Sequence, residues 1–334
     1  MRNKVRKRVE KNFFDTPEMA TTIDISTFIE GGYSNEKNQV SLTAIMTAYL
    51  RAYHAMNDTP KIFDDFLAYR LIPEERRALI EQGFSRALQI NVPESILACS
   101  DQATNTLPSL LQAMGLPNVL SRSRYTEDNL DQAVKQGVEQ YVILGAGLDT
   151  FAFRRPDLLS QVQVFEVDHP ATQAFKLNRL AELEWEIPSN LHFVPVDFTK
   201  ESLADALKGT SYDLQTKSFF SWLGVTMYLT QNEVFATLRS ITDIAPVGSA
   251  VIFDYFVPEE ATPYMKKIQE NLRKIGEPIK TTFDPSTLAF ELESLGLRLH
   301  ENLSPSDIQE RYFQSRTDGY YASKHVRFAR AVVE

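Results

Sequence analysis

The sequence predicts an α/β protein in which a helical N-terminal region is followed by a doubly wound, mainly parallel sheet. Two observations lead to this prediction. Between residues 40 and 135, apolar residues recur at three- and four-residue steps, which is the spacing of one face of an α-helix. From residue 141 onward, short apolar runs alternate with helical segments, as they do when helices cover both faces of a parallel sheet.

The helices of the N-terminal region are separated by prolines, which open or end them. They are predicted over 40–56, 60–72, 73–88 and 95–114. A further helix is expected to begin at Thr126, an N-cap residue followed by acidic residues, and to end at Gly137. That helix leads directly into the first strand.

Seven strands are predicted in the rest of the chain. They cover 141–144, 162–167, 191–196, 218–223, 249–256, 295–302 and 325–333. Helices are expected between them near 170–183, 200–208 and 231–243. The last two strands alternate more and are expected to close the sheet as an antiparallel edge. Residues 257–285 have helical spacing and are predicted to cap the site.

The composition limits the function classes. The chain has 334 residues, a net charge of −9 and a single cysteine, Cys99. The acidic balance argues against a nucleic-acid-binding surface, and one cysteine excludes an intrachain disulfide. No apolar run is long enough to span a membrane, and the basic N-terminus lacks the apolar stretch of a secretory signal. We therefore expect a cytoplasmic protein that acts on small molecules and binds neither nucleic acid nor membrane.

The turn after the first strand, "LGAGLDT" over 144–150, has the glycines that let a backbone approach a ligand. A dinucleotide-binding fingerprint would place a third glycine at Thr150, and here Asp149 precedes it. A carboxylate at this position repels a pyrophosphate but favours a sulfonium, so S-adenosylmethionine fits better than NAD. The alternative is that Asp149 and Thr150 only cap the next helix.

Acidic residues also end the next two strands. Asp168 follows Gly147 by 21 residues, the position at which an acid commonly binds a ribose diol. Asp197 and Phe198 end the third strand, where a carboxylate can accept the adenine amino group and an aromatic ring can pack on the adenine. The alternative is that Asp197 or Thr199 caps a helix and Phe198 belongs to the core. No metal site is predicted.

Two segments in this order, "LGAGLDTFAFR" and "FEVDHPATQAFK", resemble the leucine carboxyl methyltransferase family and its bacterial O-methyltransferase relatives. The segments "RSRYTEDNL" and "GVTMYLT" are similar to that family too, so the resemblance runs from about residue 40 to at least 260. It implies a Rossmann-like methyltransferase sheet of seven strands with the last one antiparallel. It also implies S-adenosyl-L-methionine as the cofactor, S-adenosyl-L-homocysteine as the product, and no metal.

The resemblance also implies roles for single residues. Arg122 best matches the arginine that holds the methionine carboxylate, with Arg124 as the second candidate. Gly145, with Gly147 and Asp149 in the same turn, would line the methionine portion. Asp168 would bind the ribose hydroxyls, and Asp197 with Phe198 the adenine. The chain departs from the family at Leu223, where many members have a glutamate.

These residues divide the chain into a helical lid and substrate region over 1–125 and a cofactor-binding core over 126–334. We expect methyl transfer to a carboxylate or hydroxyl oxygen of a small molecule. A carboxylate needs no general base, whereas a hydroxyl does, and no residue is singled out as that base. Tyr228 is a candidate for the acceptor pocket. The alternatives are an NAD-dependent oxidoreductase and a non-catalytic S-adenosylmethionine-binding module.

Overall fold

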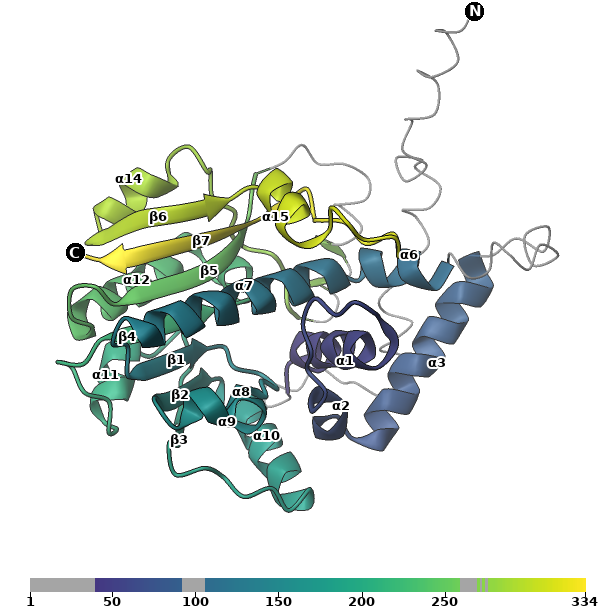
Figure 1. The fold of residues 1–334 in the computed structure, drawn as a ribbon, viewed down its shortest axis with the longest axis horizontal. Helices are drawn as coiled ribbons and strands as arrows, with labels where there is room; N and C mark the ends of the chain where they lie inside the picture. Colours follow the sequence, from purple (N-terminus) through teal and green to yellow (C-terminus); the bar gives the residue numbers. More distant parts are fainter. Residues whose placement is uncertain (1–39, 92–105, 259–268, 271, 274–275) are drawn as a thin grey trace, which may run out of the picture.

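The computed structural model describes residues 40–91, 106–258, 269–270, 272–273 and 276–334 (Figure 1). Residues 1–39 and parts of the predicted segments 95–114 and 257–285 lie outside these ranges. The strands are β1 (Gln140–Leu144), β2 (Gln163–Asp168), β3 (Leu191–Pro195), β4 (Ser218–Trp222), β5 (Ala250–Phe256), β6 (Leu297–Leu303) and β7 (Val326–Val333). All seven predicted strands are confirmed.

The N-terminal helices are α1 (Leu42–Asn57), α2 (Ala68–Leu71), α3 (Glu74–Asn91), α6 (Thr106–Ala113) and α7 (Leu116–Lys135). The helices between and after the strands are α8 (Phe151–Arg154), α9 (Pro156–Leu159), α10 (Pro170–Glu182), α11 (Leu203–Lys208), α12 (Gln231–Ile244), α14 (Leu288–Glu293) and α15 (Pro305–Tyr312). A short 3₁₀ turn, η3 (Thr226–Tyr228), follows β4. None of the helices in the described ranges is long and apolar enough to span a membrane.

The strands form one sheet in the order β3-β2-β1-β4-β5-β7-β6. β1 pairs in parallel with both β2 and β4, so the strand order reverses between β1 and β4. β7 is antiparallel to both of its neighbours, β5 and β6. The predicted doubly wound sheet with an antiparallel last strand is therefore confirmed. The last strand lies between β5 and β6, however, and β6 forms the edge.

The core lies on both faces of this sheet. In β1, Tyr141 and Ile143 join a cluster with residues of α1 and α7, whereas Val142 and Leu144 join a second cluster with residues of α11 and α12. Successive side chains of a strand point to opposite faces, so one buried strand serves both clusters. Figure 1 shows α7 crossing one face of the sheet, with α1, α2 and α3 gathered at one end of it.

The helix before β1 begins ten residues earlier than predicted. α7 starts after Gly115, which has a φ of +85°, and Pro117 occupies its first turn, where a missing N–H costs nothing. Thr126 is not an N-cap: it is buried within the helix. The acidic residues that suggested a helix start belong to the middle of a longer helix. α7 crosses residue 125, so our predicted boundary between the lid region and the core falls within one helix.

Two other segments are less helical than predicted. Within 60–72 only α2 is helical, because Asp65 is tied to other elements: Arg51 Nε lies 2.8 Å from its Oδ2, and the Thr150 hydroxyl donates to its Oδ1. Within the predicted cap 257–285, residues 277–284 form neither helix nor strand. Their backbone instead hydrogen-bonds to the segment after β4: the Lys280 N–H donates to the Met227 carbonyl at 2.7 Å. Proline at position 278 also opposes a helix there.

Candidate functional site

The glycine turn after β1 is closely packed. Gly145 and Gly147 have φ values of +71° and +54°, which favour glycine. A Cβ on Gly145 would lie 2.3 Å from Val225 Cγ2, and one on Gly147 would lie 3.2 Å from Ala44 Cβ. The turn is therefore enclosed between α1 and the segment that follows β4. Backbone conformation and packing therefore favour glycine at both positions.

Asp168, at the end of β2, lies directly beside this turn. Its carboxylate accepts hydrogen bonds from the backbone N–H groups of Gly147 and His169, the latter at 2.6 Å. Burial raises the pKa of Asp168, and these two backbone hydrogen bonds oppose that rise. The structure thus brings together the two residues whose 21-residue spacing suggested a shared site. The same hydrogen bonds couple the ribose-binding candidate to the shape of the glycine turn.

Asp149 has a structural role in the turn. Its Oδ1 accepts the Phe151 N–H at 2.7 Å, so it caps the first turn of α8, as the alternative interpretation predicted. The turn's carbonyls are held by two cations that the sequence did not point to. Lys176 Nζ lies 2.6 Å from the Asp149 carbonyl oxygen, and Arg51 donates to the Leu148 carbonyl at 2.8 Å.

Lys176 is 1% exposed and also lies 2.5 Å from Glu166 Oε2, forming a buried ion pair between α10 and β2. Burial raises the pKa of Glu166 to about 7, and Lys176 opposes that rise. A lysine within the apolar face of a predicted helix was the available signal for this contact. Through Lys176, the pair connects β2 to the Asp149 carbonyl of the glycine turn.

Arg122 reaches the turn that follows β4. From α7, its Nη1 donates to Asp254 Oδ2 at 2.8 Å, and Asp254 Oδ1 accepts the Gly224 N–H at 2.6 Å. A Cβ on Gly224 would lie 2.5 Å from Arg122 Nη2, so only glycine leaves room for the guanidinium. Asp254 is completely buried, and its only sequence signal is that a carboxylate interrupts the apolar run of β5.

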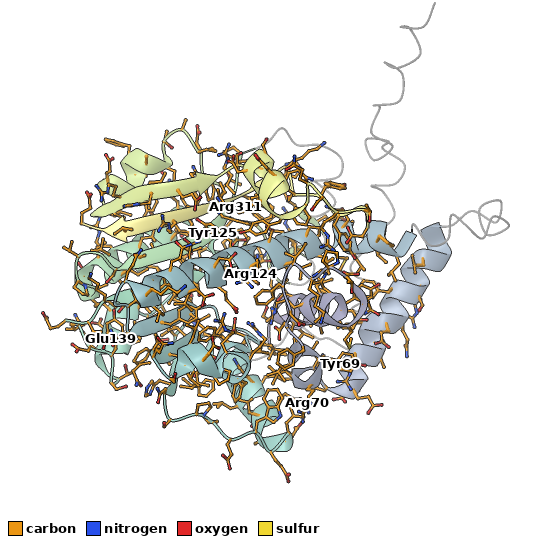
Figure 2. All side chains as sticks on the ribbon, viewed as in Figure 1. Tyr69, Arg70, Arg124, Tyr125, Glu139 and Arg311 are labelled. Carbon is orange, nitrogen blue, oxygen red and sulfur yellow. The ribbon has the colours of Figure 1, made fainter. Side chains whose placement is uncertain are left out.

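Arg124 lies elsewhere. Two residues along a helix correspond to a rotation of about 200°, so Arg122 and Arg124 leave α7 in nearly opposite directions. Arg124 forms an ion pair with Asp128 at 2.6 Å. Figure 2 labels it next to Tyr125 on α7, with Arg311 of α15 nearby. The structure therefore does not bring Arg124 to the glycine turn, and its partner is a carboxylate one turn further along α7.

Asp197 and Phe198 lie at the end of β3, beside β2, because the Val196 N–H donates to the Asp168 carbonyl at 2.8 Å. Asp197 caps the local turn: its Oδ1 accepts the Thr199 N–H at 3.0 Å, and Lys200 Nζ lies 2.5 Å from Oδ2. Burial would raise the pKa of Asp197, but Lys200 and Thr199 outweigh it and lower the pKa to about 2. Phe198 is half-buried, and its ring centroid lies 6.0 Å from that of Trp222, which is fully buried in the core.

Tyr228, in η3, belongs to a polar cluster between the sheet and α1. Its hydroxyl hydrogen-bonds with Thr43 near the start of α1. Burial raises the pKa of Tyr228 well above its usual value, the carboxylate of Glu277 adds to the rise, and Thr43 and Arg122 oppose it. Leu223 packs against the core cluster that contains residues of α1 and α7, so the position of the family's glutamate is apolar here.

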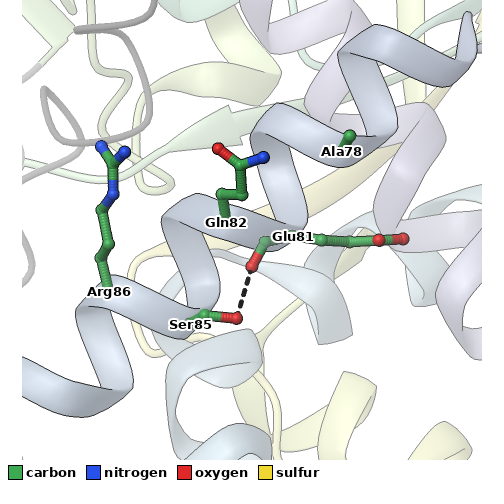
Figure 3. Close-up of a pocket in the computed structure, with 5 residues that line it drawn as sticks. All are labelled: Ala78, Glu81, Gln82, Ser85 and Arg86. Carbon is green, nitrogen blue, oxygen red and sulfur yellow. Dashed lines mark hydrogen bonds between the residues drawn. The ribbon is translucent and has the colours of Figure 1, made fainter.

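A separate hollow of about 370 Å³ lies along α3 (Figure 3). The described residues that line it come from one face of that helix: Ala78, Glu81, Gln82, Ser85 and Arg86. The dashed line in Figure 3 is a hydrogen bond within the helix, from the Ser85 hydroxyl to the Glu81 carbonyl at 2.9 Å. None of the predicted site residues lines this hollow, so it is distinct from the site at the strand ends.

Solved structures resemble this fold. "Crystal structure of a putative methyltransferase from Thermobifida fusca YX" matches with a TM-score of 0.50 and 16% identity, over 73% of this chain and 90% of that one. At that identity the likeness concerns the fold alone. With the sheet order and the glycine turn at the strand-order reversal, it defines the class of protein: this is a methyltransferase fold.

The sequence comparisons are more specific. The family model for leucine carboxyl methyltransferase matches residues 44–242. "Putative S-adenosyl-L-methionine-dependent methyltransferase YktD" of Bacillus subtilis is 38% identical over 301 residues, which is 89% of this chain and 99% of that protein. A "Putative S-adenosyl-L-methionine-dependent methyltransferase" of Mycobacterium bovis is 31% identical over 251 residues, 73% of this chain and 68% of its own length. The chain belongs to the leucine carboxyl methyltransferase family.

Proposed function

We propose that this protein transfers a methyl group from S-adenosyl-L-methionine to an oxygen atom of a small molecule. The observation that carries the proposal is the arrangement at the strand ends. A glycine turn, an arginine and two carboxylates lie around the strand-order reversal, where ligands bind in open α/β sheets. The names of the relatives support the choice of this cofactor.

The residues present suit a zwitterionic, phosphate-free cofactor. Arg122 would hold the methionine carboxylate. Its guanidinium is fixed in place because Nη1 is hydrogen-bonded to Asp254 and the group lies against the Gly224 turn. Asp168 would bind the ribose hydroxyls. Asp197 and Phe198 would receive the adenine. Asp149 caps a helix, and this negative charge still disfavours a pyrophosphate at the turn.

The cofactor would supply an electrophilic methyl group, and the protein would need to align the acceptor oxygen with it and exclude water. The enclosure of the glycine turn by α1 favours such exclusion, since Ala44 lies against Gly147. A cytoplasmic location, a small-molecule acceptor and a reaction without a metal are part of the same proposal.

Isothermal titration with S-adenosylmethionine, S-adenosylhomocysteine and NAD tests the cofactor. We expect the two sulfur compounds to bind and NAD not to. At a ligand concentration of about 100 times the dissociation constant, binding adds about 2.7 kcal/mol to the free energy of unfolding. Binding of NAD alone would favour an oxidoreductase. Binding of S-adenosylmethionine without methyl transfer from the labelled compound to any small-molecule acceptor would favour a cofactor-binding module.

A further inference from the structure

A carboxylate oxygen next to the candidate acceptor pocket has an unmet capacity for hydrogen bonding. Glu277 begins the irregular segment 277–284, whose backbone hydrogen-bonds to Met227 of η3 and Phe256 of β5. The Ser41 hydroxyl donates to its Oε1 at 2.8 Å. Its Oε2 is buried and has no hydrogen-bond partner among the residues that the structure describes. A buried acceptor without a donor is costly, so this atom is suited to a ligand that brings a hydrogen.

The position of Glu277 relates it to the cofactor site. Ser41 is the N-cap of α1, and one turn further along Ala44 lies against Gly147 of the glycine turn. The negative charge of the carboxylate also raises the pKa of the Tyr228 hydroxyl. Glu277 therefore contacts the N-cap of the helix that covers the glycine turn and lies near Tyr228, the candidate for the acceptor pocket.

The charge of Glu277 is not balanced by a described neighbour. Arg122, the arginine of the candidate site, is paired with Asp254. Within the described ranges, no lysine or arginine forms an ion pair with Glu277. An unpaired carboxylate repels a second carboxylate but accepts a hydrogen bond from a hydroxyl. The site's chemistry therefore discriminates between the two acceptor classes that the sequence left open.

We propose that Glu277 is the general base of the reaction and that the methyl acceptor is a phenol or a comparably acidic hydroxyl. This inference rests on the proposed function. The acceptor hydroxyl donates to Oε2, and its oxygen forms a bond to the methyl carbon as the carbon–sulfur bond breaks. The electron pair of that bond goes to sulfur, which leaves as the neutral thioether. The hydroxyl proton moves to Oε2 and is later released to water.

The test uses the full chain, S-adenosylmethionine with a labelled methyl group, and a series of phenols paired with benzoates of the same ring substitution. We expect label in the phenols as alkali-stable ethers. Glu277→Gln should lower kcat/KM by at least about 100-fold, the usual contribution of a general base, while the dissociation constant of S-adenosylmethionine stays within about twofold. Glu277→Asp should retain part of the rate.

Glu291→Gln is the matched control. Glu291 lies on α14, also accepts a hydroxyl hydrogen on one oxygen, from Thr287 at 3.2 Å, and also has an Oε2 without a described partner. Glu291→Gln should leave the methyltransferase activity unchanged. Thermal unfolding would show whether each variant folds. Alkali-labile ester products, label in neither series, or a Glu277→Gln variant with normal turnover or reduced cofactor affinity would overturn the assignment. Failure of the wild-type chain to bind S-adenosylmethionine would instead overturn the proposed function itself.

Discussion

The contact between the glycine turn and the segment after β4 can be tested by adding one carbon atom. Gly145→Ala would place its Cβ 2.3 Å from Val225 Cγ2, in a backbone conformation with a φ of +71°. The chain offers a control for the backbone alone. Gly137, at the end of α7, has a φ of +87°, and a Cβ there would meet no atom within 4 Å. Comparing the two variants separates the effect of the conformation from that of the contact.

The expected magnitudes follow from these two environments. The left-handed conformation costs a residue with a Cβ roughly 1–2 kcal/mol, so Gly137→Ala should lower the free energy of unfolding by about that amount. Gly145→Ala carries the same cost and a further 1–3 kcal/mol or so for overpacking, because a valine side chain is stiff at χ1 and cannot move aside freely. Its total should be about 2–5 kcal/mol.

Removing the obstructing methyl groups completes the test. In a Val225→Ala background, Gly145→Ala should cost only about 1–2 kcal/mol, since the contact no longer exists. Equilibrium unfolding in urea, followed by circular dichroism, measures all four proteins and Gly137→Ala. Equal losses for Gly137→Ala and Gly145→Ala would refute the packing argument. So would a cost of Gly145→Ala that stays the same when Val225 is replaced.

Three further predictions concern the charged residues. Arg122→Lys should weaken S-adenosylmethionine binding at least about tenfold, because an ammonium cannot replace the guanidinium fork, whereas Arg124→Lys, whose partner is Asp128, should stay within about twofold by calorimetry; the reverse ranking would overturn the assignment. Asp168→Ala should cost about 1.5–3 kcal/mol of cofactor binding for each lost charge-assisted hydrogen bond, and Asp149→Asn less, so equal losses in the same titration would contradict their roles. The pKa of Asp197 is lowered in the fold, so its stabilisation is present above its ordinary pKa of 3.8 and is lost as the pH falls towards about 2. Asp197→Asn should therefore lower the free energy of unfolding near pH 6 by up to about 1 kcal/mol, since Lys200 is mostly exposed, and an undiminished difference below pH 2 would argue against the ion pair.

The strands and the residues of the glycine turn could be predicted from local sequence patterns alone. Short apolar runs bounded by turn residues have few alternative structures, and all seven strands were predicted in place. Patterns within one segment also identified Asp168 as a neighbour of the turn, because the ends of adjacent parallel strands must meet at one edge of the sheet. Helix limits were less certain. The start of α7 was misplaced because N-cap-like residues also occur inside helices, where burial and packing outweigh local preference.

Which charged groups share the site depends on packing between distant segments and could not be predicted from the sequence. Arg122 and Arg124 leave α7 in nearly opposite directions, and the sequence does not show which of them faces the Gly224 turn. Asp254 and Glu277 lie 132 and 236 residues from their partners Arg122 and Ser41. Contacts over such separations leave no periodicity in the sequence, because they arise when the strands and the segments between them pack together. The buried Oε2 of Glu277, which has no hydrogen-bond partner among the described residues, exists only as a consequence of that packing.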